Sequence, residues 1–385
     1  MLSLKKIENK EIVIFKFLFF IWILAIPFKN AVYQVAVASM IIFFFVHLLK
    51  NRRVDILIEN FKQTKYLTIG FFCIIISMFL SNLFNLDYLN EKSWRLSYMF
   101  FVRYALVFIL LSYFYRLDFF NKKEITISLF SSFILLGLTG VFQILLNPDI
   151  ITGLGITGTL DNRNAFGLFM GMGFVLSLVL IKDQKVLGLF LILFFSFLMI
   201  FSFSRSSWVA SACSVFIMFI LNYKKIKIIH FIYLVVFCIF IVTLYFTFDS
   251  FQERFKQLLE GDSSSRTTIW MHTIVFIKEK ILFGYGVSTW KLLPDTFLNQ
   301  FPDPHNMILE ILIYTGFVGL TASIFSILIV LIKIFTTKNF ILFPIASYFL
   351  VVTQFDFGAF GSKEILSFLT IFVFFIYSDS FKVAK

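Results

Sequence analysis

The sequence predicts an all-α polytopic membrane protein, and its composition leads directly to that class. Of its 385 residues, 59% are hydrophobic and only 15% are charged, and the mean hydropathy is +0.92. A water-soluble chain of this length could not bury so much apolar surface. The 58 phenylalanines, 17 glycines and 6 prolines exclude a collagen-like or disordered chain. No internal repeat of solenoid length is present.

Apolar runs of sufficient length predict about twelve transmembrane helices, since a bilayer core of about 30 Å needs roughly 20 apolar residues per helix. The runs lie near 12–28, 31–49, 65–84, 98–115, 124–146, 163–181, 186–203, 206–221, 228–248, 307–333, 340–356 and 363–378. The first run follows three lysines, as a signal peptide would, but it lacks a small-residue cleavage site and is interpreted as a retained helix. An even number of spans places both termini on one side of the membrane.

The distribution of positive charge orients these helices. The formal net charge is +12. With a cytoplasmic N-terminus, about 20 of the 34 Lys and Arg fall in cytoplasmic segments, including Lys224, Lys225 and Lys227. The charge therefore reflects membrane topology rather than binding of nucleic acid. Lys16 and Arg103 are exceptions, because both fall within predicted spans.

In this orientation three polar segments lie on the extracytoplasmic side, at 147–167, 201–208 and 249–304. The third is too long for a simple connection and is expected to carry structure of its own, usually with a function. We therefore divide the chain into three parts. These are transmembrane helices 1 to 9 (1–248), one long extracytoplasmic loop with amphipathic helices (249–304), and transmembrane helices 10 to 12 (305–385).

The long loop contains an arginine in an unusual place. Apolar residues at helical spacing predict an interfacial amphipathic helix near 251–259, and a second helix is expected after Gly261. Asp262 to Ser265 offer capping oxygens, so Arg266 falls in the first turn of that second helix. A cation there opposes the helix dipole unless an anion lies nearby. Either a bound phosphate or an ion pair with Asp262 or Glu260 would resolve the conflict.

Two other polar residues lie at predicted membrane boundaries. Arg205 occupies the short turn between two spans, where an arginine is costly unless it is paired or reaches lipid phosphate. Pro304 precedes an apolar run and predicts a helix start, with His305 and Asn306 in the first turn. The helix dipole disfavours imidazolium there, so the neutral imidazole is available as a base. A purely interfacial hydrogen-bonding role for the histidine is the alternative.

Two features near the C-terminal spans have structural interpretations. Gly316 and Gly319 are expected to permit close helix packing. Asp356 lies at an extracytoplasmic boundary, and a structural pairing is favoured there over a contact with substrate.

Four polar motifs follow one another on the extracytoplasmic side. They are GITGTLDNRNAFG at 155–167, SRSSW at 204–208, SRTTIW with LFGYG at 265–270 and 282–286, and PHNMILEILIYTGFVG at 304–319. In this order they resemble the bacterial O-antigen ligase and O-antigen polymerase superfamily. The resemblance covers roughly 153–319, whereas the first five helices are similar only in hydropathy.

The resemblance implies a metal-independent inverting glycosyltransferase in the bacterial cytoplasmic (inner) membrane, with its active site facing the periplasm and no cofactor. The donor would be a glycan on undecaprenyl diphosphate. The acceptor would be lipid A core oligosaccharide for a ligase, or another lipid-linked glycan for a polymerase. By resemblance, the donor diphosphate is bound by Arg205 and Arg266, which are catalytic together with His305, the residue that assists the acceptor hydroxyl. The supporting residues are Asn164, Arg163, Asn306 and Glu310.

The residue chemistry agrees with this interpretation. Loss of a lipid diphosphate from an anomeric carbon requires cations at the leaving group and a base at the incoming hydroxyl, and the guanidinium fork suits a diphosphate. No DxD pair or metal-spaced cluster is evident, and the three cysteines lie in apolar runs without CxxC spacing. A glycosidase with paired carboxylates is unsupported.

Several functions remain as alternatives at this level. The single long loop favours a ligase slightly over a polymerase, which often has two substantial loops. A lipid-linked oligosaccharide flippase would be expected to show repeated halves and ionisable groups at mid-membrane. A non-catalytic assembly factor would place no constraint on His305.

Overall fold

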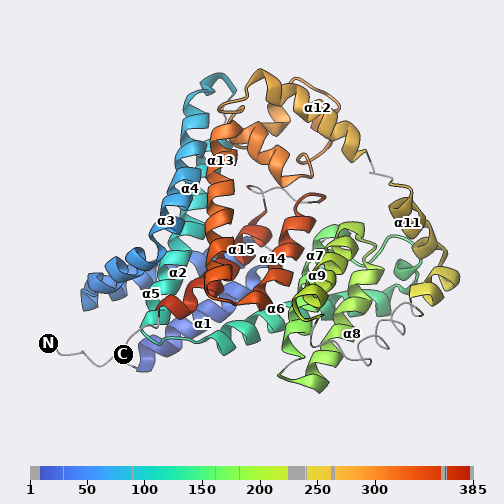
Figure 1. Cartoon of the computed structure of the whole chain (residues 1–385), viewed down its shortest axis with the longest axis horizontal. Helices are drawn as coiled ribbons and strands as arrows, with labels where there is room; N and C mark the ends of the chain where they lie inside the picture. The colour runs from blue at the N-terminus through green and yellow to red at the C-terminus, as the bar shows by residue number, and fades with distance from the viewer. Residues whose placement is uncertain are drawn as a thin grey trace. The chain divides into compact units, whose positions relative to one another are not determined.

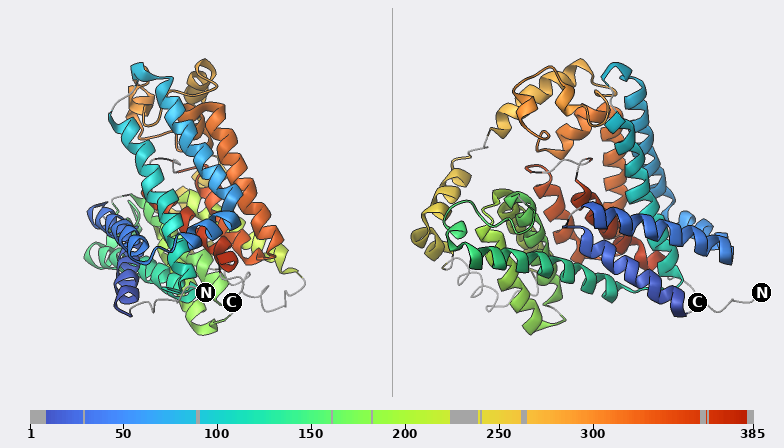
Figure 2. Two further views of the ribbon diagram at one scale, coloured as in Figure 1. Left: turned by 90° about the vertical axis from the view of Figure 1, so that its left-hand side faces the viewer. Right: turned by 180° about the vertical axis from the view of Figure 1, so that it is seen from behind.

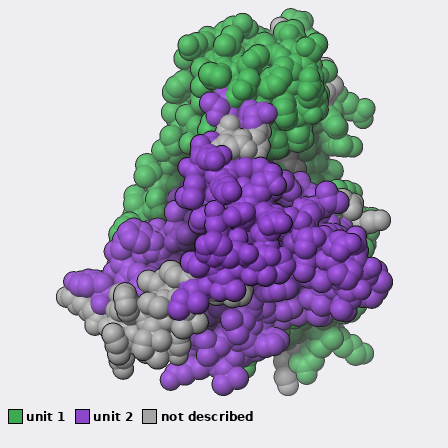
Figure 3. All heavy atoms as spheres, turned by 90° about the vertical axis from the view of Figure 1, so that its right-hand side faces the viewer, with its two compact units in different colours: residues 1–132, 268–339, 357–385 green, residues 133–267, 340–356 purple. Residues whose placement is uncertain are grey.

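The computed structural model describes residues 9–28, 30–88, 91–160, 162–181, 183–223, 239, 241–261, 265–356, 360 and 362–381 (Figure 1). Throughout these residues the regular elements are helices, without a strand. The predicted all-α class is therefore confirmed. The chain divides into two compact units, which Figure 3 distinguishes by colour and which are described separately below.

Seven of the described helices are long and apolar enough to cross a membrane, so the chain is a polytopic membrane protein. Three shorter apolar helices cover Lys185–Phe201, Arg205–Leu221 and Phe340–Val352. The predicted span at 228–248 lies mostly outside the described residues, so the number twelve stays a prediction.

Unit 1 comprises 1–132, 268–339 and 357–385. Its helices are α1 (Asn9–Ala25), α2 (Asn30–Asn51), α3 (Val54–Leu83), α4 (Glu91–Phe100), α5 (Leu106–Arg116), most of α12 (Arg266–Glu279), α13 (Met307–Thr336) and α15 (Lys363–Phe381). Helices α3 and α13 lie side by side along much of their length (Figure 2). A Cβ atom on Gly70 would lie 2.4 Å from Ser326 Oγ, and one on Gly319 would lie 3.2 Å from Ser77 Oγ. Small residues therefore permit the close approach of these two helices, as the sequence predicts for Gly319.

Helix α3 begins well before the predicted start near residue 65. Its first ten residues are more polar than the rest, so hydropathy alone did not include them. Thr64 has non-helical backbone angles (φ −112°, ψ 16°) and marks a kink. Its hydroxyl donates to the carbonyl of Asn60 at 2.9 Å, a bond that often bends helices. The helix therefore consists of a short polar segment joined at a kink to an apolar one.

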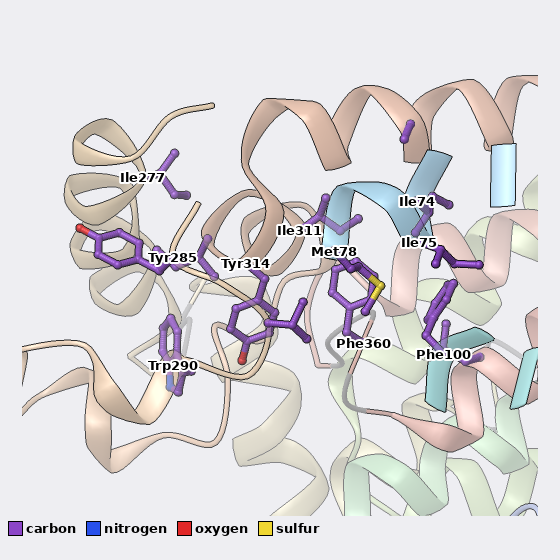
Figure 4. Close-up of a cluster of buried hydrophobic side chains, with 14 of the residues drawn as sticks. Ile74, Ile75, Met78, Phe100, Ile277, Tyr285, Trp290, Ile311, Tyr314 and Phe360 are labelled. Atoms are coloured by element: carbon purple, nitrogen blue, oxygen red, sulfur yellow. The ribbon is translucent and has the colours of Figure 1, made fainter. Parts of the chain in front are cut away.

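The segment between α12 and α13 is folded around buried aromatic side chains. It contains two short 3₁₀ turns, η5 (Trp290–Leu292) and η6 (Leu298–Gln300). Trp290 is buried, and its indole donates to the carbonyl of Phe301 at 3.0 Å. In Figure 4, Tyr285, Trp290, Tyr314 and Phe360 belong to one hydrophobic cluster. This part of the predicted loop thus has short regular turns and a buried aromatic core.

Backbone hydrogen bonds join this segment to a break inside α13. Tyr285 N donates to Ile313 O at 2.8 Å, and Phe317 N donates to Ile281 O at 2.9 Å. Between these two contacts Gly316 adopts φ 63° and ψ −162°, a region that is essentially restricted to glycine. Its close contact is with the backbone of Leu282 rather than with another helix, which corrects the helix-packing role predicted for this glycine.

Substitution of Gly316 by alanine is expected to destabilise unit 1 strongly. The new Cβ would lie 2.2 Å from the carbonyl oxygen of Leu282, in a backbone conformation that L-residues avoid. We expect a loss of about 2 to 4 kcal/mol, measured as a lower thermal unfolding midpoint in detergent. Gly261→Ala is the matched control, because Gly261 also has positive φ but an added Cβ would meet no atom within 4 Å. Equal destabilisation by both substitutions would contradict the steric explanation.

Unit 2 comprises 133–267 and 340–356. Its helices are most of α6 (Lys122–Leu146), α7 (Arg163–Leu180), α8 (Lys185–Phe201), α9 (Arg205–Leu221), α11 (Asp249–Leu259) and α14 (Phe343–Val352). Helix α7 packs against α8 and α9, and α14 packs against α9. Tyr348 on α14 donates its hydroxyl to the carbonyl of Leu168 at 2.9 Å. Helix α11 covers the range predicted for the amphipathic helix of the long loop.

Candidate functional site

Three arginines of unit 2 occupy equivalent places, because each is the first residue of a helix. Arg163 begins α7, Arg205 begins α9 and Arg266 begins α12. The last position confirms the expectation that Arg266 lies in a first turn. At each such position the cation lies beside the positive end of a helix dipole, which is unfavourable unless an anion is close. An arginine as the first residue of a helix thus occurs three times, at positions far apart along the chain.

The anion that pairs with Arg266 is the carboxylate of Asp356. Asn164 Nδ2 donates to Asp356 Oδ1 at 2.9 Å. The guanidinium of Arg266 donates to the same oxygen, and Ser206 Oγ donates to Oδ2. The Asp356 side chain is only 1% exposed and that of Arg266 is 16% exposed. The first turns of α7, α9 and α12 therefore converge on one buried carboxylate.

This pairing identifies the anion that compensates the charge of Arg266 in the first turn of α12. Its partner is Asp356, and not Glu260, while Asp262 lies outside the described residues. The structural pairing favoured for Asp356 is present, but with more partners than a simple surface ion pair. Because the carboxylate accepts from the starts of three helices, we regard Asp356 as part of the site that sequence reasoning missed.

The surroundings of Asp356 are strongly positive. Arg163 experiences electrostatic repulsion from Arg205, Arg254 and Arg266, and attraction from Asp356. Arg163 thus interacts electrostatically with three other guanidinium groups and with the Asp356 carboxylate. Arg254 is on α11, where it donates to Gln257 Oε1 at 3.0 Å. In the sequence it is distinguished only as a polar residue of an amphipathic helix.

The first two motifs of the sequence are packed against each other. Ile156 N donates to Phe201 O at 2.9 Å. A Cβ on Gly155 would lie 2.7 Å from Ser202 O, and one on Gly167 would lie 2.5 Å from Ser204 Cβ. Glycine is therefore required where the 153–167 segment approaches the turn before Arg205. Asn162 caps α7 by accepting from the backbone of Asn164 at 2.8 Å, and this fixes the helix start at Arg163.

His305 belongs to unit 1, and its place differs from the prediction. Helix α13 begins at Met307, and Asn306 is its N-cap, accepting from Leu309 N at 3.0 Å. His305 precedes the helix with φ 50° rather than lying in its first turn. Asn306 is the N-cap because its side-chain oxygen accepts from a backbone N–H group in the first turn of α13. The imidazole of His305, one position earlier, does not occupy the capping position.

Asp303 holds His305 in this position. Its Oδ1 accepts from His305 N at 2.7 Å and lies 3.3 Å from His305 Nδ1. A carboxylate beside Nδ1 favours the tautomer that carries the proton on that nitrogen. The basic lone pair then belongs to Nε2. Asp303 was not recognised from the sequence, although its spacing of two residues from the histidine was the available signal.

Glu310 supports the same region from the first turn of α13. Its side chain is buried, and Oε2 accepts from Phe360 N at 3.0 Å. Helix α12 makes a further contact, since Trp270 Nε1 donates to Pro304 O at 3.0 Å. Pro304 is adjacent to His305, and Trp270 lies one turn after Arg266 on α12. Glu310 therefore fixes the backbone at Phe360, and Trp270 fixes the backbone next to His305.

The predicted site residues therefore fall into two groups. Arg163, Arg205 and Arg266 lie in unit 2 with Asn164, and the first turns of their helices meet at Asp356. The residues in unit 1 are His305, Asn306 and Glu310. The described residues contain no group of three or more His, Cys, Asp or Glu side chains that could hold a metal ion.

Burial of Asp303 is expected to make the stability of the fold depend on pH. It raises the pKa of the Asp303 carboxyl above its ordinary value of 3.8, and the charge of His305 offsets this only in part. Between 3.8 and the raised pKa, the folded protein retains a proton that the unfolded chain has released. The stability that Asp303 contributes is therefore complete at low pH and is lost as pH rises through the folded pKa.

Asp303→Asn is accordingly expected to gain stability relative to the unmodified protein as pH rises. Asparagine keeps an oxygen acceptor for His305 N but carries no charge. The measurement is the thermal unfolding midpoint of both proteins in detergent between about pH 4 and pH 7. A difference between the two proteins that does not change with pH would contradict the expectation.

Comparison with known proteins supports the resemblance found in the sequence. No curated protein matches the chain. A family model described as O-antigen ligase matches residues 188–324. That region includes Arg205, Arg266, His305 and Glu310, whereas Arg163 and Asp356 lie outside it. The match confirms that the chain resembles the O-antigen ligase and O-antigen polymerase superfamily.

Proposed function

We propose that the protein transfers a glycan from undecaprenyl diphosphate to a sugar hydroxyl, and that it acts as an O-antigen ligase on lipid A core oligosaccharide. Its family resemblance supports a membrane glycosyltransferase, and its apolar helices make it a membrane protein. The observation that carries the proposal is the convergence of three helix starts, each with an arginine, around Asp356.

That convergence supplies what a diphosphate leaving group requires. When the bond from the anomeric carbon to the diphosphate oxygen breaks, negative charge develops on the leaving group. Arg205 and Arg266 are proposed to bind this charge through bidentate contacts. Arg163 adds positive potential, and Asn164 holds the carboxylate that orients Arg266. Asp356 and the four arginines together carry a net positive charge, which suits an anionic ligand.

His305 is proposed to act on the acceptor. Its Nε2 would take the proton from the acceptor hydroxyl as that oxygen attacks the anomeric carbon, and Asp303 would stabilise the imidazolium through Nδ1. Attack from the side opposite the diphosphate inverts the anomeric configuration in one displacement. The guanidinium groups supply the positive charge at the leaving group, so we propose that the reaction does not depend on a metal ion.

The distribution of Lys and Arg in the sequence supports an orientation in the bacterial cytoplasmic membrane with both termini cytoplasmic and the site facing the periplasm. In that orientation the site faces the compartment in which lipid-linked glycans and lipid A core would be its substrates.

Complementation tests the proposal. The gene is expressed in a strain that lacks O-antigen ligase and in one that lacks O-antigen polymerase, and surface polysaccharide is examined on a gel. A ligase restores polysaccharide attached to lipid A core in the first strain only. Restoration only in the second strain would identify a polymerase that uses the same donor site. Transport of the lipid-linked donor across the membrane without glycan transfer would contradict the proposal and identify the protein as a flippase.

A further inference from the structure

One half-buried cation of unit 1 has no role in the proposed transfer. Arg103 lies in a single-turn π-helix, η2 (Phe101–Ala105), between α4 and α5. A π-turn inserts one residue into an otherwise continuous helix, and such turns are frequent at functional sites. Here the insertion lies within the apolar span Glu91–Arg116, where an arginine is costly unless its charge is compensated.

A second cation lies beside the same aromatic ring. The guanidinium carbon of Arg103 is 6.0 Å from the centroid of the Tyr33 ring, and Lys363 Nζ is 5.5 Å from it. Tyr33 is fully buried, and its hydroxyl is 2.8 Å from Ser367 Oγ. Lys363 is the first residue of α15 and also donates to the carbonyl of Phe28. Thus η2 and the first residue of α15 bring two cations from distant parts of the chain to one ring near the start of α2.

The charges in this cluster do not balance. Lys363 Nζ lies 3.7 Å from Glu364 Oε1, and the Lys363 side chain is only 10% exposed. Arg103 forms no ion pair with any carboxylate in the described part of the chain. Contacts with an aromatic face stabilise a cation only modestly. Two cations and one carboxylate leave a net positive charge among half-buried side chains, which favours an anionic ligand.

The two cations line a small pocket whose other walls are apolar or aromatic. Arg103 and Lys363 line it, and its other five lining residues are the apolar or aromatic Leu96, Met99, Phe100, Tyr104 and Phe360. The Phe360 ring packs 5.8 Å from that of Phe100, centroid to centroid, and its backbone N–H is held by Glu310. A ligand that fits needs an anionic group joined to an apolar chain.

We propose that this pocket binds the phosphate group of an anionic membrane lipid, with Arg103 and Lys363 as its two cationic contacts. The proposal does not depend on the glycosyltransferase assignment. The phosphate belongs either to a polyprenyl phosphate or to a glycerophospholipid, and both present the same chemistry to the two cations. The apolar wall formed by the aromatic residues would contact the first carbons of the lipid chain.

The test is lipid binding to the full-length protein in detergent, measured by native mass spectrometry. The probes are undecaprenyl phosphate and phosphatidylglycerol, with zwitterionic phosphatidylcholine as the lipid control. We expect Arg103→Gln/Lys363→Gln to weaken binding of an anionic probe by about 10-fold or more, because each lost cation removes a charged hydrogen bond. Lys333→Gln is the matched control, since Lys333 Nζ lies 5.3 Å from the Tyr377 ring in the same unit but outside the pocket.

Each outcome decides the proposal. Weakening for undecaprenyl phosphate alone supports it with a polyprenyl ligand, and weakening for both anionic lipids supports it with a general phosphate head group. The titration is repeated in an Arg205→Ala background, so that a lipid bound at the proposed donor site does not enter the comparison. The single variants Arg103→Gln and Lys363→Gln provide the same test if the double variant does not fold. Unchanged binding in the folded variants, or equal weakening by Lys333→Gln, would overturn the proposal.

Discussion

Replacement of Arg266 by alanine is expected to lower glycan transfer by about 100-fold or more, because one preorganised cation at the leaving group is lost. The same change also leaves Asp356 as a buried carboxylate without its guanidinium partner. Removal of one member of a buried ion pair costs about 3 to 5 kcal/mol, so the variant should also unfold at a lower temperature. Both quantities are measured on purified protein, with a lipid-diphosphate glycan donor for the transfer assay.

A second substitution separates the two effects. In Arg266→Ala/Asp356→Asn a neutral amide replaces the carboxylate, so the stability should recover while transfer stays low. Recovery of transfer together with stability would show that Arg266 acts only through the fold. Arg95→Ala is the control, because Arg95 is an exposed arginine of α4 that is absent from the proposed site. Full activity of Arg266→Ala in the presence of reduced stability would contradict donor binding by this residue.

The sequence predicted the helices well where local patterns determine them. Apolar runs found most of the long helices, and the polar stretch before Arg266 indicated the start of α12. These signals depend on residues within one or two turns of each other. The early start of α3 was missed because hydropathy does not register a polar helical segment joined at a kink such as Thr64.

The partners within the site were beyond local patterns. Arg266 and Asp356 are separated by 90 positions, and nothing in either segment indicates that the other is its partner. The conflict between Arg266 and its helix dipole did show that an anion was required, but not which one. At His305 the local pattern gave the region correctly and the helix start wrongly, since Pro304 suggested a start that Asn306 determines instead.

His305 provides the second large expected effect. His305→Ala should lower the turnover of glycan transfer by about 100-fold to 10,000-fold, the usual contribution of a positioned general base. The apparent affinity for the lipid-diphosphate donor should stay within about twofold, because the histidine is assigned to the acceptor hydroxyl and not to the diphosphate. The measurement is the initial rate as a function of donor concentration, with acceptor in excess.

His272 offers a matched control, because it is also a histidine paired with an aspartate. Its Nδ1 lies 2.7 Å from Asp295 Oδ2, and its side chain is 43% exposed. His272→Ala should therefore leave turnover nearly unchanged, although the same kind of histidine–aspartate contact is removed. A large loss of donor affinity in His305→Ala, with turnover preserved, would show that the histidine binds the donor rather than the acceptor. Equal losses of turnover in both histidine variants would instead indicate a general effect of His–Asp pairs on the fold. Only a selective loss of turnover in His305→Ala is the result expected of a base that takes the acceptor's proton.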